Sequence, residues 1–294
     1  MNNAEKYSAN SATKEKHTST ESSPRDKWLN WLYKTRLGNF ALRLVFCRRW
    51  LSKLAGLYMD SALSRRHIPH FVAKNKIDLT QYEDCSYKSF NDFFIRRLRP
   101  GRRPFSQLPS AIISPADGML SAVNLSATST FVIKGNSYSV SSLLRDVKLA
   151  TEYENGLAVI FRLRVQDYHR YIYIDKGKGG PVRRLSGNYH TVSPVGLEYT
   201  SVWQENSREW QQLFYENIGD IIQVEVGAMM VGRIVNHDVT TFERGEEKGY
   251  FCFGGSTVVL LFKANQIQLI DTFTDCFERE LPILQGQTFG ELLL

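Results

Sequence analysis

One short stretch near the end of the chain, Gly254-Gly255-Ser256-Thr257, combines a hydroxyl with an unusually free backbone. Two glycines allow positive φ or a strained turn, and the apolar, β-branched run 258–262 that follows predicts a buried strand. A hydroxyl beside such a deformable peptide bond is a candidate for attack on its own backbone. The alternative is a glycine turn that enters a core strand with an incidental serine.

Two further side chains could support that chemistry. Asp117 lies in the turn Ser114-Pro115-Ala116-Asp117-Gly118, and His169 lies in Asp167-Tyr168-His169-Arg170 after an alternating apolar segment. A serine needs a base to become a nucleophile, and a histidine oriented by an aspartate is one solution. Taken singly, Asp117 is typical of a turn residue that bonds its own backbone, and His169 of a structural histidine.

The elements that must position these residues change character near residue 104. Aromatic and basic residues interleave over 28–66 as in amphipathic helices, and 87–98 predicts a helix that follows a serine or asparagine cap. Later strands are expected at 119–123, 130–140, 157–165, 180–185, 198–203, 212–216, 221–226, 229–235, 239–242 and 258–262. Short strands with glycine punctuation favour a sandwich or barrel over a βαβ fold. The predicted fold class is α+β, with N-terminal amphipathic helices followed by a mainly antiparallel β sandwich or barrel-like catalytic domain.

Three parts follow from these patterns. Residues 1–25 are polar and almost free of large apolar side chains, which predicts a disordered tail. Residues 26–104 form a helical region that we expect to associate with a membrane, and residues 105–294 form the β-rich catalytic domain. The alternative for 28–66 is a pair of amphipathic helices packed on their own domain or on a second subunit.

Composition limits the possible partners. The 294 residues carry a formal net charge of +7, with much of the basic excess before residue 104, which indicates an anionic partner such as nucleic acid or an acidic membrane surface. No base-reading motif accompanies the charge, so we expect no nucleic acid partner. The four cysteines are scattered without a C-x-x-C pair, so they are interpreted as reduced thiols and no metal site is expected. We also expect neither a secretory signal nor a membrane-spanning run of about eighteen apolar residues.

Five sequence blocks, taken in order, carry a family resemblance. They are Asn-Asp-Phe-Phe-Ile-Arg-Arg-Leu-Arg-Pro at 91–100, Ser-Pro-Ala-Asp-Gly at 114–118, Asp-Tyr-His-Arg at 167–170, Val-Gly-Ala to Val-Gly at 226–232, and Gly-Glu-Glu-Lys-Gly to Gly-Gly-Ser-Thr at 245–257. Together they resemble the phosphatidylserine decarboxylase proenzyme family, in a form with Tyr-His-Arg-Tyr and Gly-Gly-Ser-Thr motifs. The resemblance covers the chain from about residue 58 to its end.

The resemblance implies that the chain cuts itself between Gly255 and Ser256. The Ser256 Oγ would attack the Gly255 carbonyl to give an ester, and β-elimination would then leave a covalent pyruvoyl group made from Ser256. The β and α chains of the same precursor would stay associated. The pyruvoyl carbonyl would serve as the electron sink for decarboxylation, so neither a metal nor pyridoxal phosphate is implied. Asp117 matches the family aspartate that acts with the serine.

The histidine departs from the usual pattern. Family members read Tyr-His-Arg-x-His with the second histidine in the cleavage triad, and Ile172 stands at that place here. His169 matches the first histidine, which implies a catalytic or substrate-contacting role and reprotonation of the substrate carbon. The base for cleavage is left open; His190 is the leading candidate and His237 a poorer one. Tyr168 and Arg170 are expected to bind substrate.

The function that the resemblance implies is conversion of phosphatidylserine to phosphatidylethanolamine and CO2. Its partners would be phosphatidylserine and an anionic membrane surface, with peripheral attachment at the cytoplasmic face and a possible homodimer. One alternative is a pyruvoyl-dependent decarboxylase of a soluble amino acid. Another is an uncleaved lipid-binding relative, which Ile172 alone supports.

Overall fold

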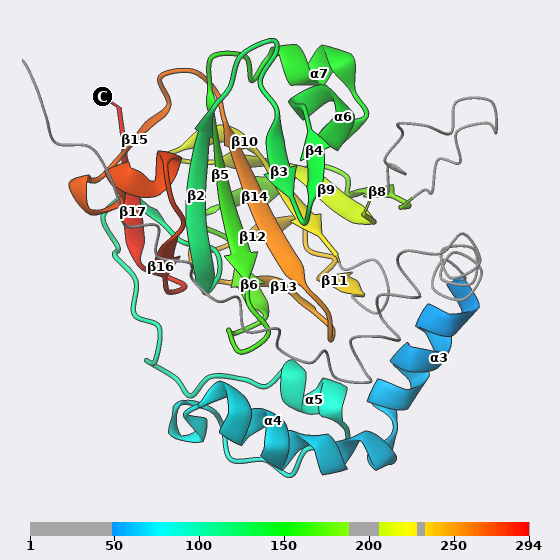
Figure 1. Cartoon of the computed structure of the whole chain (residues 1–294). Helices are drawn as coiled ribbons and strands as arrows, with labels where there is room; N and C mark the ends of the chain where they lie inside the picture. The colour runs from blue at the N-terminus through cyan, green and yellow to red at the C-terminus, as the bar shows by residue number, and fades with distance from the viewer. Residues whose placement is uncertain (1–48, 188–205, 228–232, 294) are drawn as a thin grey trace, which may run out of the picture. The chain divides into compact units, whose positions relative to one another are not determined.

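The structure is a computed structural model that describes residues 49–187, 206–227 and 233–293. The described residues form a unit that begins at Arg49, with helices first and antiparallel strands after them (Figure 1). The expected tail over 1–25, the expected strand over 198–203 and His190 lie outside the described residues.

The helical part contains three α-helices and two short 3-10 helices in the described range. They are α3 (Arg49–Asp60), η1 (Ala62–His67), α4 (Ile68–Asn75), η2 (Leu79–Gln81) and α5 (Phe90–Phe94). The Ser89 hydroxyl caps α5 by accepting a hydrogen bond from the Asp92 amide at 3.1 Å. The helix ends at Phe94 and is shorter than the predicted span 87–98. Beyond it, the buried Arg96 side chain turns inward and donates to the Gln166 carbonyl at 2.9 Å.

A nine-stranded antiparallel sheet forms the centre of the β-rich part, in the order β12-β7-β9-β10-β14-β5-β2-β16 with β8 paired to β9. Its strands are β2 (Gly118–Asn124), β5 (Leu157–Leu163), β7 (Gly177–Gly179), β8 (Arg183–Leu185), β9 (Arg208–Tyr215), β10 (Gly219–Val226), β12 (Thr241–Phe242), β14 (Ser256–Phe262) and β16 (Leu281–Ile283). The order starts and ends on different strands, so the sheet is open. The described strands therefore form no closed barrel, and the barrel alternative is wrong.

Three smaller sheets accompany the main one. They are β1 (Ala111–Ile113) with β17 (Thr288–Leu292) and β15 (Ile267–Leu269), then β11 (Ile234–Asn236) with β13 (Glu247–Phe251) and β6 (Arg170–Ile172), and last the hairpin of β3 (Phe131–Ile133) and β4 (Asn136–Tyr138). The sequence predicted one strand over 130–140. The chain instead reverses at Lys134-Gly135, where both residues have positive φ, 53° and 79°. Two central residues with positive φ suit the turn of a tight hairpin.

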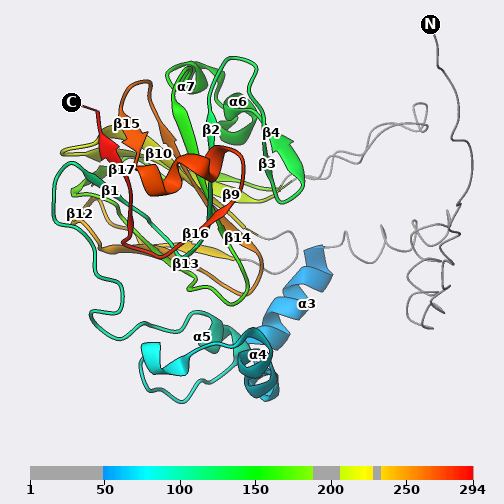
Figure 2. The same cartoon turned by 60° about the vertical axis from the view of Figure 1, so that its left-hand side comes forward.

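Apolar clusters lie on both faces of the main sheet, which explains why β14 is apolar without interruption from Val258 to Phe262. Val258 and Leu260 belong to the cluster shared with β1, β6, β13, β17 and η4 (Asp271–Phe277). Val259 and Leu261 belong to the cluster shared with β3, β4, α6 (Val140–Leu144) and α7 (Val147–Thr151), which lie on the other face (Figure 2). Every residue of β14 is buried. The predicted α+β class with a mainly antiparallel sandwich is confirmed.

Candidate active site

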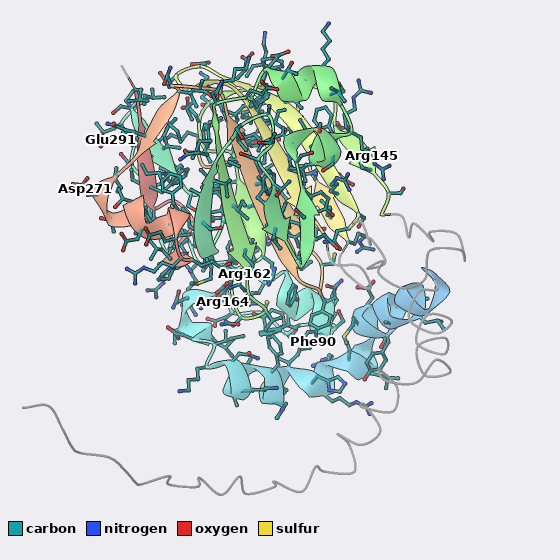
Figure 3. All side chains as sticks on the ribbon, turned by 45° about the horizontal axis from the view of Figure 1, so that its top comes forward. Phe90, Arg145, Arg162, Arg164, Asp271 and Glu291 are labelled. Atoms are coloured by element: carbon teal, nitrogen blue, oxygen red, sulfur yellow. The ribbon has the colours of Figure 1, made fainter. Side chains whose placement is uncertain are left out.

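The candidate site lies where β2, β5 and β14 come to one end of the main sheet. Ser256 is the first residue of β14 and pairs with Leu163, the last residue of β5. On the other side of β5, Arg162 pairs with Met119 near the start of β2, so the turn that holds Asp117 lies at the same end. Neighbouring strands are about 4.8 Å apart, and Asp117 and Ser256 therefore approach this end two strands apart. Figure 3 shows Arg162 and Arg164 at this end of β5, on the side where α5 lies.

Ser256 combines a buried side chain with a backbone conformation on its N-terminal side that glycine adopts readily. The residue is 1% exposed, and Gly254 has a φ of 149°, which residues with a side chain rarely adopt. The expected use of glycine freedom before Ser256 is thus confirmed. The Ser256 hydroxyl donates to the Gly254 carbonyl over 3.4 Å, a long contact that leaves the hydroxyl weakly held.

The carbonyl of the Gly255-Ser256 peptide bond accepts a hydrogen bond from a lysine. The Lys134 Nζ, from the turn between β3 and β4, lies 2.6 Å from the Gly255 oxygen and 2.7 Å from the Val226 oxygen. The lysine side chain is half-buried, and desolvation lowers the pKa of its amine to about 7. A donor on this oxygen withdraws electrons from the carbonyl carbon that Ser256 would attack.

Asp117 is held by groups other than a histidine. Arg103 donates two hydrogen bonds to its carboxylate, at 2.9 Å from Nε and 2.6 Å from Nη2, and the Gln285 amide donates a third at 2.7 Å. Both carboxylate oxygens are therefore engaged in a bidentate pair, the strongest form of such a contact. Gly118 after it is confined, because an added Cβ would lie 2.6 Å from the Arg162 oxygen. No described histidine has a hydrogen bond to Asp117.

His169 is completely buried beneath α5. Its ring stacks on Phe94 with centroids 3.9 Å apart, and its Nε2 lies 3.1 Å from the Arg164 carbonyl oxygen. A carbonyl only accepts, so Nε2 carries the proton and Nδ1 is left as an acceptor, which has no hydrogen-bond partner among the described residues. Burial, with the nearby Arg96 charge, lowers the His169 pKa to about 3. The imidazole is therefore neutral over the physiological pH range.

Tyr168 and Arg170 hold the helical part to the strands. Burial raises the pKa of Tyr168 to about 12, and its ring lies 6.3 Å from that of Tyr82. The Arg170 guanidinium donates from Nε to the Ile95 carbonyl at 2.8 Å and from Nη1 to the Glu247 carboxylate at 2.7 Å. In this arrangement both side chains are occupied by the protein itself, and their expected role in binding substrate stays a prediction.

Three other positions bear on the base for cleavage. Ile172, which stands where the usual cleavage histidine would be, is 7% exposed in the main apolar cluster. His237 contacts the Glu247 carboxylate at 2.8 Å, and His190 lies outside the described residues. The identity of the base for Ser256 thus stays a prediction.

Several residues that fix the site were missed from the sequence. Asn91 on α5 accepts a hydrogen bond from the Phe253 amide at 2.9 Å and donates to Asp60 at 2.6 Å, so it ties the chain just before the two glycines to the helices. Phe94, Arg103 and Lys134 were missed as well. A lysine followed by glycine inside an alternating apolar run was a signal for a hairpin turn, but nothing in the sequence showed where that turn would point.

Within the described ranges, no group of three or more histidine, cysteine, aspartate or glutamate side chains could hold a metal ion. The described cysteines, Cys85, Cys252 and Cys276, are free thiols. This end of the sheet brings together a serine, a lysine, a carboxylate and a neutral imidazole.

Comparison with known proteins gives a consistent result. The family model of phosphatidylserine decarboxylase matches residues 90–291. Phosphatidylserine decarboxylase proenzyme 2 of Clostridium acetobutylicum is 42% identical over 265 residues, which cover 90% of this chain and 91% of the relative. Proenzymes of the same description from Ruminiclostridium cellulolyticum and Clostridium botulinum are 38% and 40% identical over 273 residues, with 90% of this chain covered and 91% and 92% of the relatives.

Proposed function

The chain belongs to the phosphatidylserine decarboxylase family, and we propose that it removes the carboxyl group of phosphatidylserine as CO2 to leave phosphatidylethanolamine. The observation that supports this most directly is the placement of Ser256. It is a buried serine at the first position of a core strand, preceded by a glycine at a φ of 149°. In this position Ser256 could react with the Gly255-Ser256 peptide bond, while the pairing of β14 would hold the new N-terminus in the sheet.

Apart from one water molecule, which the final hydrolysis consumes, the proposed maturation uses only groups of this chain. The Ser256 Oγ bonds to the Gly255 carbonyl carbon, the C–N bond breaks, and the Ser256 nitrogen takes up the hydroxyl proton, which leaves an ester. Loss of the Ser256 Cα proton and cleavage of the Cβ–Oγ bond then free the Gly255 carboxylate and leave dehydroalanine. Its tautomer hydrolyses to pyruvoyl and releases ammonia. The backbone ladder of β14 to β5 and β10 holds the α chain in place throughout.

The site fits a group made from Ser256. Ser256 is buried at the start of β14, which pairs with β5 and β10, whereas Gly255 before it is exposed. The group would therefore be held by the strand on its C-terminal side and would face solvent on its N-terminal side. When formed, the pyruvoyl carbonyl supplies the electron sink for the charge left as CO2 departs. Positioning of the substrate and movement of its protons fall to the side chains around it.

His169 is proposed as the group that moves a proton to the substrate carbon. Its Nε2–H is fixed on the Arg164 carbonyl, and its Nδ1 is a buried acceptor without a hydrogen-bond partner among the described residues. Because the imidazole is neutral, any proton that it returns to the carbon must first reach Nδ1, the ring nitrogen without a hydrogen-bond partner among the described residues. The stack on Phe94 keeps the ring orientation fixed during that exchange.

Asp117 and a histidine are proposed to assist the cleavage of the precursor. Arg103 and Gln285 fix the Asp117 carboxylate at the same end of the sheet as Ser256, which supports a role in orienting the reacting groups. His190 remains the candidate base for Ser256. Replacement of His190 by alanine should slow cleavage, whereas a normal rate of cleavage in that variant would exclude it.

A membrane surface is the proposed setting of the reaction. On α3 and η1, Leu57 is 66% exposed and Leu63 is 71% exposed, and the exposed Arg65 and Arg66 follow directly. Apolar side chains beside basic ones suit the headgroup layer of an anionic bilayer. No helix in the described ranges is long and apolar enough to cross a membrane. We propose peripheral attachment at the cytoplasmic face.

Turnover of defined substrates tests the proposed function. Purified protein should release CO2 from phosphatidylserine in mixed vesicles, and Ser256→Ala should release none. Free serine offered at the same concentration should be a much poorer substrate. Preference for free serine would favour the soluble amino acid decarboxylase, and vesicle binding without any CO2 release would favour the uncleaved lipid-binding relative.

A further inference from the structure

We propose that Lys134 is a catalytic residue of the self-cleavage, supplying positive charge to the Gly255 carbonyl oxygen as that oxygen becomes negative. The inference rests on the proposed function, because it concerns the maturation of the same site. It assigns to a lysine from the β3–β4 hairpin the stabilisation that a serine nucleophile requires at the carbonyl it attacks.

The hairpin directs the lysine onto the scissile bond. Phe131 and Ile133 are buried in the apolar cluster on that face of the sheet, so the turn that follows them has a fixed place. From this turn the Lys134 Nζ reaches the Gly255 oxygen at 2.6 Å and the Val226 oxygen at 2.7 Å. The second contact fixes the amine from another strand. Donors within about 3 Å of a reacting oxygen have the geometry of an oxyanion site.

The charge of Lys134 is incompletely compensated before cleavage. Its two hydrogen-bond partners are neutral carbonyls, and no carboxylate in the described ranges lies within ion-pair distance of it. Partial desolvation favours the neutral amine and lowers its pKa to about 7. A negative charge on the Gly255 oxygen would supply the missing partner. Lys134 therefore binds the charged transition state better than the ground state, which is the condition for catalysis.

Two steps of the cleavage place negative charge on this oxygen. When the Ser256 Oγ bonds to the Gly255 carbonyl carbon, the π electrons of the carbonyl move onto the oxygen beside Lys134. The C–N bond then breaks and the ester forms. In the β-elimination, the Cβ–Oγ bond breaks and its electron pair leaves with the Gly255 carboxylate, whose charge also lies beside the ammonium. One lysine thus assists both the acyl shift and the departure of the leaving group.

The test is the rate of precursor cleavage, followed by intact mass after rapid purification or cell-free synthesis. Lys134→Met should cleave about 10²- to 10³-fold more slowly than the unaltered protein, the usual loss when one oxyanion donor is removed. Lys148→Met is the matched control, because it removes an exposed lysine on α7 and should cleave at the unaltered rate. Cleavage of Lys134→Met within about threefold of the unaltered rate would overturn the proposal.

A pH profile separates a catalytic lysine from a structural one. The unaltered rate should decline above about pH 7 as Lys134 loses its proton. His169 senses the lysine charge but stays neutral above about pH 3, so it does not contribute to this decline. Lys134→Met should lack the descending limb. If Lys134→Met cleaves slowly but keeps the descending limb, the lysine has a structural role and the proposal is overturned. If the unaltered protein never cleaves, the proposed function is refuted instead.

Discussion

Burial of a neutral His169 makes the stability of the fold depend on pH in a way that can be measured. In the unfolded chain the imidazole takes up a proton near its ordinary pKa of 6.5, whereas in the folded protein the pKa is lowered to about 3. Between these values the unfolded state binds more protons than the folded state, so stability falls as the pH falls from 6.5 toward 3. Each pH unit in that window costs about 1.4 kcal/mol.

The expected size follows from the width of that window. At pH 5 the protein lies about one and a half units below the unfolded pKa and well above the folded one, so His169 should cost about 2 kcal/mol of unfolding free energy relative to pH 8. The value depends little on the folded pKa, provided that it stays below about 4. His169→Asn should remove this part of the pH dependence, because asparagine does not titrate.

Urea unfolding at pH 5 and pH 8 measures the effect. All variants should carry Ser256→Ala, so that a single uncleaved species unfolds. The change between the two pH values should be about 2 kcal/mol smaller in His169→Asn than in its parent, and His70→Asn, at an exposed position, should follow the parent. Equal changes in the parent and in His169→Asn would refute the burial of a neutral imidazole at this position.

Two further results are expected from matched pairs of variants. Arg103→Met leaves the buried Asp117 carboxylate without its bidentate partner, so the free energy of unfolding measured in urea should fall by about 3–5 kcal/mol. In the control Arg279→Met, which breaks an exposed i,i+4 ion pair, it should fall by less than about 1 kcal/mol. Equal losses in the two variants would contradict the role of Arg103. Leu57→Glu should weaken binding to anionic vesicles by tenfold or more, as expected from about 1.5–3 kcal/mol for one buried leucine, and the equally exposed Leu108→Glu should bind normally. Normal sedimentation of Leu57→Glu with vesicles would place the membrane contact elsewhere.

The sequence was most informative where one local pattern decides the structure. The apolar, β-branched run after Ser256 had to be a buried strand, and two glycines before it marked a backbone that other residues cannot adopt. The turn at Asp117 was recognisable from its proline, aspartate and glycine. The class of fold followed from such elements, because short strands with glycine punctuation leave few alternatives to antiparallel sheets.

Tertiary contacts decided what the sequence could not show. The helix expected over 87–98 stops at Phe94, since the carbonyls that Arg96 reaches come from a loop about 70 residues later. The open sheet and the barrel have the same local pattern, and only the pairing order separates them. Lys134 is an unremarkable lysine in the sequence, and its contact with Gly255 joins residues 121 positions apart.

The intact mass spectrum of the purified protein is the most direct test of the central claim. We expect two chains, a larger one that ends at Gly255 and a smaller one that starts at residue 256. The smaller chain should be lighter, by the mass of one ammonia, than the fragment that simple hydrolysis would give, because the pyruvoyl group replaces the amino terminus of Ser256. A single uncut chain of 294 residues after long incubation, or a smaller fragment that keeps its serine, would contradict the proposed origin of the prosthetic group.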